Sequence, residues 1–185
     1  RQPARGKNAM AQQADDPPAA PPPAKPRDDS AALFAAIRAD DVQRFERALF
    51  EGASVDSTAA VEAEDGFSAA YSRAGYMLTA LMLAVGLGRN RIARLLFERG
   101  ADVHGRDGFG ATAVYIGAEF GNVEMIVTLA AAGGDVNSAA NFGSTPVCMA
   151  ALNGHAETVR VLAELGACVK TPANDSTTPG CAAAQ

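Results

Sequence analysis

The sequence predicts an all-α solenoid of stacked antiparallel helix pairs, and three observations support this prediction. Each unit holds two short apolar segments, and each segment ends at a glycine. Turn-forming residues separate one unit from the next. Many residues recur every 33 positions, as in the pairs Thr112 and Thr145, Gly121 and Gly154, and Gly133 and Gly166. A fixed period of this length is typical of stacked units, which usually act through a shared surface rather than an enclosed pocket.

The unit that starts at Thr112 shows why each segment should be a helix. Its first apolar segment covers residues 113–120, and Thr112 precedes it where a side chain can cap a helix. In its second segment, 123–130, the apolar residues Met125, Ile126 and Leu129 follow helical spacing. The glycines suit the left-handed conformation that ends helices. In the following unit, Thr145 is placed to cap in the same way, and Pro146 fits the first helical position.

The organisation of the chain follows from this period and its interruptions. Residues 1–29 hold seven of the ten prolines and no aromatic, Leu, Ile or Val, which predicts an extended tail. The tail is a linker, a remnant of a targeting peptide, or a ligand that docks on a partner through Pro23-Ala24-Lys25-Pro26. The repeat domain is expected over 30–185, with units at about 31–56, 74–106, 107–139 and 140–172 and a partial unit at 173–185. An insertion at 57–73 is expected to form a projecting finger with its own short turn or helix.

Composition excludes several classes of function. A net charge of −5 argues against a nucleic-acid binder, and no apolar run is long enough to cross a bilayer. No pattern of nucleophile, base and acid indicates an enzyme, and neither a cofactor nor a metal is expected. Cys148 and Cys181 occupy equivalent positions about 10 Å apart at typical helix spacing, too far for a disulfide, so free thiols are expected. Free thiols favour an intracellular location, either the cytoplasm or, after removal of a transit peptide, a chloroplast or mitochondrion.

These motifs resemble the ankyrin repeat. Thr145-Pro146-Val147 through Gly154-His155 follows its pattern, as does Gly134-Asp135-Val136-Asn137. The resemblance implies a histidine after the leucine of each first helix, where this chain has Phe34, Met82, Tyr115 and Cys148, so the usual side-chain hydrogen bond to the loop is expected to be missing. In the first unit, Asp40-Asp41 replaces Gly-His and Arg44 replaces a core valine, which suits a terminal repeat.

In this family the residues that face a partner lie in the turns before each threonine and directly after the paired alanines. The resemblance therefore implies a non-catalytic protein-binding surface. It consists of an aromatic row, Tyr76, Phe109 and Phe142, and a helix-end group, Leu87, Glu119, Phe120, Leu152 and Asn153. The alternative is that each ring only covers its neighbouring turn.

Three functions fit such a surface. The first is an accessory or scaffold subunit held in a larger assembly. The second is a reversible adaptor that recruits client proteins. The third is the regulatory repeat region of a longer enzyme or channel.

Overall fold

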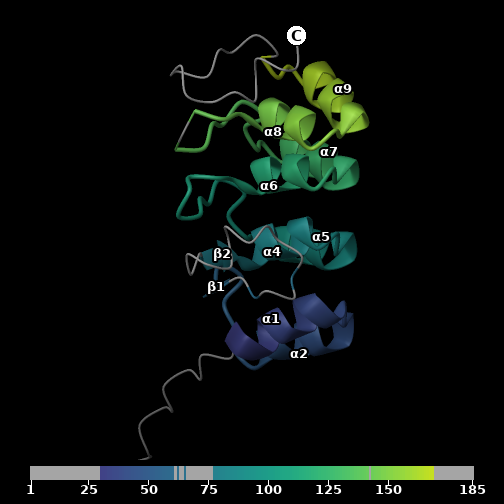
Figure 1. Ribbon diagram of the computed structural model, residues 1–185. Coiled ribbons are helices and arrows are strands. Elements are labelled where there is room, and N and C mark those ends of the chain that lie inside the picture. The colour runs from purple at the N-terminus through teal and green to yellow at the C-terminus, as the bar shows by residue number, and fades with distance from the viewer. Residues whose placement is uncertain (1–29, 61, 63–64, 66–76, 142, 169–185) are drawn as a thin grey trace, which may run out of the picture.

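The computed structural model describes residues 30–60, 62, 65, 77–141 and 143–168. In this part of the chain, eight helices form antiparallel pairs that stack in chain order along one axis (Figure 1). The predicted all-α solenoid is confirmed. The pairs are α1 (Ser30–Ala39) with α2 (Val42–Phe50), α4 (Ala80–Gly86) with α5 (Asn90–Glu98), α6 (Ala113–Glu119) with α7 (Val123–Ala131), and α8 (Pro146–Leu152) with α9 (Ala156–Glu164).

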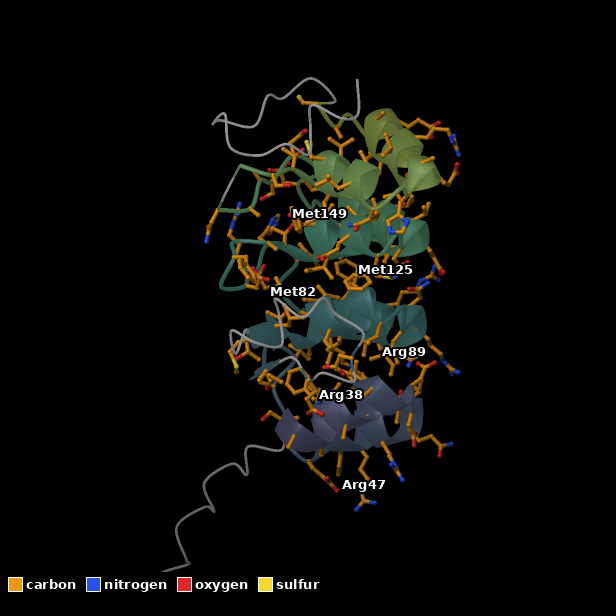
Figure 2. The ribbon with its side chains drawn as sticks, viewed as in Figure 1. Arg38, Arg47, Met82, Arg89, Met125 and Met149 are labelled. Atoms are coloured by element: carbon orange, nitrogen blue, oxygen red, sulfur yellow. The ribbon has the colours of Figure 1, made fainter. Side chains whose placement is uncertain are left out.

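The first helices of the pairs pack on one another and form an inner layer, and the second helices form an outer layer. The hydrophobic core runs between the layers along the whole stack. Met125, Ile126 and Leu129 are all fully buried in it, as their helical spacing predicts. Figure 2 shows Met82 and Met125 between the stacked ribbons, whereas Arg47 points into solvent at the first end of the stack.

The helices begin and end largely where the sequence predicts. Gly121 and Gly133 have φ values of 71° and 91°, the left-handed conformation expected at helix ends. The Thr112 side chain accepts a hydrogen bond from the Tyr115 N–H at 3.3 Å and so caps α6. Thr145 has the backbone of a capping residue, but its side chain makes no capping bond, and its buried hydroxyl has no partner in the described part of the structure. Thr145 therefore takes the predicted N-cap position, but the predicted side-chain hydrogen bond is not formed.

The first repeat carries a charged residue at a position that is apolar and buried in the second and third repeats. Arg44 corresponds in register to Ile92 and Met125, which are fully buried, yet its own side chain is 75% exposed and pairs with Asp41. No helix pair lies below it in the described structure, so this position has no apolar neighbour to pack against. Asp40 takes the left-handed φ of 55° that glycine has in the later repeats.

The insertion begins and ends in a small antiparallel sheet. Strand β1 (Thr58–Ala60) pairs with β2 (Met77–Thr79), with Thr58 opposite Thr79 and Ala60 opposite Met77. The sheet brings the two ends of the insertion together beside α1, which it contacts. The tail 1–29, residues 61, 63–64 and 66–73 of the insertion, and the partial fifth unit lie outside the described residues.

The expectation of free thiols is wrong at one position. Cys148 is disulfide-bonded, and its partner lies outside the described residues. The estimate used the regular spacing of two stacked helices and did not predict this disulfide. Cys168 is exposed and is not in a disulfide.

Candidate interaction surface

The turn between α5 and α6 is held in shape by a buried carboxylate. One oxygen of Asp107 accepts hydrogen bonds from the backbone N–H groups of Phe109 and Ala111, both at 2.8 Å. Burial raises the pKa of the Asp107 carboxyl, because it disfavours the charged form, and the two backbone donors act in the opposite direction. The turn that carries Phe109 is therefore rigid.

The following turn lies against this one. The backbone N–H of Asn141 donates to the Phe109 carbonyl at 2.7 Å, and its side chain donates to Gly108 at 3.2 Å. The Arg106 guanidinium joins the same two turns, since it donates to the carbonyls of Gly110 at 2.7 Å and Ala139 at 3.0 Å. A side chain at Gly110 would place its Cβ 2.3 Å from the Asn141 side chain, so only glycine fits there.

A second set of bonds joins each helix pair to the pair before it. The residue directly after the glycine that separates two paired helices donates to a carbonyl at the end of the preceding inner helix. Arg89 donates to Arg38 at 3.2 Å, Asn122 donates to Val85 at 3.0 Å, and the Nε2 of His155 lies 2.9 Å from the carbonyl oxygen of Glu119. Of the three residues, only His155 matches the Gly-His pair of the ankyrin pattern. The regular spacing of the three positions was the signal that could have identified the other two.

These bonds fix the ends of the inner helices, where the family's partner-facing residues lie. We use the name inner-helix row for the two residues at this position in each repeat: 38–39, 86–87, 119–120 and 152–153. Within the row, Leu152 is 54% exposed and Asn153 is also exposed. Leu87 and Phe120 are half-buried and pack against the core, and Glu119 is half-buried.

The predicted aromatic row is described at one position only. Phe109 is half-buried and packs against the core, and its backbone is held on both sides by the bonds to Asp107 and Asn141. Tyr76 and Phe142 lie outside the described residues. A role for these rings in partner binding stays a prediction.

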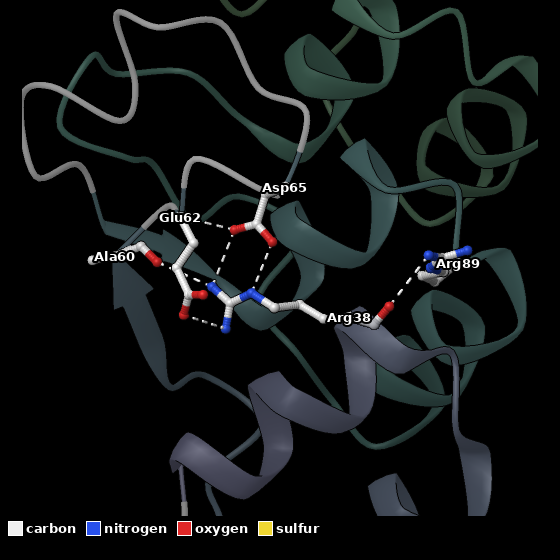
Figure 3. A network of polar contacts seen from close by, with 5 residues as sticks. All are labelled: Arg38, Ala60, Glu62, Asp65 and Arg89. Atoms are coloured by element: carbon white, nitrogen blue, oxygen red, sulfur yellow. Dashed lines mark hydrogen bonds and ion pairs between the residues drawn. The ribbon is translucent and has the colours of Figure 1, made fainter.

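An ion-pair cluster at the first repeat was not predicted from the sequence. The Arg38 guanidinium binds Asp65 through two nitrogens, at 2.8 and 3.1 Å, and contacts Glu62 at 3.1 Å (Figure 3). It also donates to the Ala60 carbonyl at 3.2 Å. The Asp65 side chain is 2% exposed and accepts from the Glu62 N–H as well. These contacts tie the insertion to the end of α1.

One of the substituted histidine positions carries a buried phenol. Tyr115 is buried, and burial raises the pKa of its hydroxyl, while the nearby Ser144 side chain acts in the opposite direction.

No group of three or more His, Cys, Asp or Glu side chains in the described part of the chain is placed to hold a metal ion. None of its helices is long and apolar enough to span a membrane.

Stacked helix pairs with projecting turns and a row of residues at the inner-helix ends define a repeat solenoid of the protein-binding class. The family models for ankyrin repeats match this chain, one for three copies over residues 113–185 and one for many copies over residues 78–130. The chain belongs to the ankyrin-repeat family. No curated protein matches the sequence. Ankyrin repeats generally mediate protein–protein interactions and are typically non-catalytic.

Proposed function

We propose that this protein is a non-catalytic interaction module that binds a protein partner along the inner-helix row, in the second to fourth repeats. The observation that carries the proposal is the exposure of Leu152. It is an apolar side chain, 54% exposed, on a helix end that belongs to the same inner-helix row as Leu87 and Phe120. An exposed apolar side chain beside polar neighbours such as Asn153 is typical of a contact surface.

The rigidity of the row supports the same proposal. His155 and Asn122 hold the carbonyls of two inner-helix ends, so the main chain that carries Leu87 and Phe120 is ordered before any partner binds. A surface that is already ordered loses little conformational entropy on binding. The helix ends in this chain are therefore suited to recognise a partner segment directly.

The experiment uses a matched pair of apolar substitutions. Leu152 on the inner-helix row and Val127 on the outer helix α7 are both exposed, at 54% and 44%. Peptides are selected from a random display library on the wild-type chain, and their affinities for Leu152→Ala and Val127→Ala are measured by fluorescence anisotropy. We expect at least about a tenfold loss for Leu152→Ala, as for an interface anchor, and no change for Val127→Ala. Equal effects of the two substitutions would refute the proposed surface.

Of the three possible roles, we propose that of an accessory or scaffold subunit in a larger assembly. Apolar side chains are exposed at both ends of the described stack, with Phe50 on α2 at 93% and Leu165 after α9 at 38%. Surfaces of this kind are more often covered in an assembly than left in water. Phe50 stands where α5 has the exposed Glu98, so an apolar side chain at this exposed position is a feature of the first repeat and not of the scaffold.

Size-exclusion chromatography of the native protein separates the roles. A stable complex much larger than the chain is expected for a subunit. A free monomer would indicate a reversible adaptor, and a single longer polypeptide would indicate the regulatory region of an enzyme or channel. Docking of the Pro-rich tail on a partner is part of the proposal and is tested by deleting residues 1–29 before the same measurement.

The intracellular location predicted from the cysteines assumed free thiols. The disulfide at Cys148 removes that support, because disulfides persist mainly in oxidising compartments. The location stays a prediction, and fluorescence microscopy of the tagged protein tests it.

A further inference from the structure

The first repeat differs from the others at its partner-facing position. Arg38 stands in the inner-helix row where later repeats have Gly86, Glu119 and Leu152. Its side chain does not project freely from the row. The insertion between the first and second repeats bends back to it and contacts the guanidinium through three residues, Ala60, Glu62 and Asp65 (Figure 3).

The contacts around Arg38 are those of a bound carboxylate ligand. Asp65 accepts two parallel hydrogen bonds from the guanidinium, the arrangement by which arginine recognises carboxylates in general. Asp65 is almost fully buried, while the Arg38 side chain remains 23% exposed and Glu62 is 60% exposed. The pKa of Arg38 is raised, mainly by the hydrogen bond to Asp65.

The main chain at Arg38 is fixed independently of the insertion. Its carbonyl accepts a hydrogen bond from Arg89 of the second repeat, and the helix that carries it is buried on its other side through Phe34 and Ile37. Displacing the insertion would therefore leave the guanidinium in place at the end of α1, open to another carboxylate.

We propose that Ala60, Glu62 and Asp65 act as a built-in competitor, which occupies the first-repeat position of the inner-helix row and keeps acidic groups of a partner away from Arg38. The inference rests on the proposed function, since it assigns the partner chemistry of the same surface. With the competitor bound, the partner contacts the second to fourth repeats. With the competitor displaced by an aspartate or glutamate of the partner, the contact extends to the first repeat.

The test uses the full chain and a variant that frees the guanidinium, Glu62→Gln with Asp65→Asn. Peptides are selected from a random display library on this variant, and their affinities are measured by fluorescence anisotropy. We expect peptides that contain Asp or Glu and bind the variant at least about tenfold more tightly than the wild type, because the competitor reduces the fraction of molecules with a free Arg38. Adding Arg38→Gln should remove the gain.

A control substitution and a chemical probe keep the test decisive. Arg94→Gln breaks an exposed ion pair with Glu124 on the outer helices and should leave these affinities unchanged. In the wild type, phenylglyoxal should modify Arg38 more slowly than the exposed Arg91, and the Asp65 variant should remove the difference.

Three results would overturn the inference. These are equal peptide affinities for the wild type and the variant, no enrichment of acidic peptides on the variant, and equal modification rates of Arg38 and Arg91 in the wild type. Failure of the proposed function would give a different result, because Leu152→Ala would then leave the affinity of peptides selected on the wild type unchanged.

Discussion

Two threonines at equivalent positions should respond to the same substitution with opposite signs. Thr112 and Thr145 begin α6 and α8, both are 5% exposed, and both have an extended backbone, with φ and ψ of −101° and 170° and of −92° and 161°. They differ in one contact. The Thr112 hydroxyl accepts the Tyr115 N–H, whereas the Thr145 hydroxyl is buried with no partner among the described residues.

Valine has nearly the shape of threonine and tolerates the same backbone, so Thr→Val isolates the hydroxyl. At Thr112 it removes a helix cap and leaves the Tyr115 N–H unpaired, which should lower the free energy of unfolding by about 1 kcal/mol. At Thr145 no bond is lost, and the cost of burying an unpaired hydroxyl disappears. Thr145→Val should therefore raise the free energy of unfolding by about 1 kcal/mol.

Urea denaturation followed by circular dichroism measures both variants. The expected difference between them is about 2 kcal/mol, which corresponds to roughly 4–8 °C in melting temperature for a chain of this size. Loss of stability by a similar amount in both variants would refute the reasoning, because it would mean that the Thr145 hydroxyl makes a hydrogen bond as stabilising as that of Thr112.

Two further predictions concern the contacts behind the inner-helix row and the carboxylate that holds the turn at Phe109. Asn122→Ala removes the bond to the Val85 carbonyl and a helix cap, so it should lower the free energy of unfolding by about 1–2 kcal/mol. Asn153→Ala removes only an exposed bond and should change the free energy of unfolding by less than about 0.5 kcal/mol. Urea denaturation of both variants tests this contrast, and equal effects would contradict it. Asp107 has a pKa raised in the folded state, so folding favours its protonated form, and its contribution to stability should decrease as the pH rises above the ordinary value of 3.8. The difference in unfolding free energy between the wild type and Asp107→Asn, measured from pH 4 to 7, should change in this direction, and a pH-independent difference would rule it out.

The repeat architecture could be predicted because the sequence encodes it locally. Gly121 and Gly133 mark helix ends by their conformational freedom, and Met125 with Leu129 marks a buried face by spacing alone. Each of these signals depends on residues within one repeat, and it recurs in the following repeats at the same positions. The exposed Arg44 of the first repeat was predictable in the same way, since it interrupts a position that is otherwise apolar.

The contacts that shape the candidate surface were less accessible to sequence reasoning. Arg38 and Asp65 are 27 residues apart, across an insertion that has no period, so no spacing rule brings them together. Thr112 and Thr145 share residue type and position, yet only the packing around each hydroxyl decides whether it finds the N–H group. The disulfide at Cys148 was not predicted, because the estimate used only the regular spacing between stacked helices.

The central claim is that a partner binds along the inner-helix row, and site-specific photo-crosslinking tests it most directly. Benzoylphenylalanine is incorporated at Asn153 on the row, or at Arg160 on the outer helix α9, both exposed, and the protein is irradiated in the cells that produce it. The account predicts a discrete crosslinked product from position 153 that is reduced by Leu152→Ala, and none from position 160. A product from position 160 alone, or equal products from both positions, would contradict it.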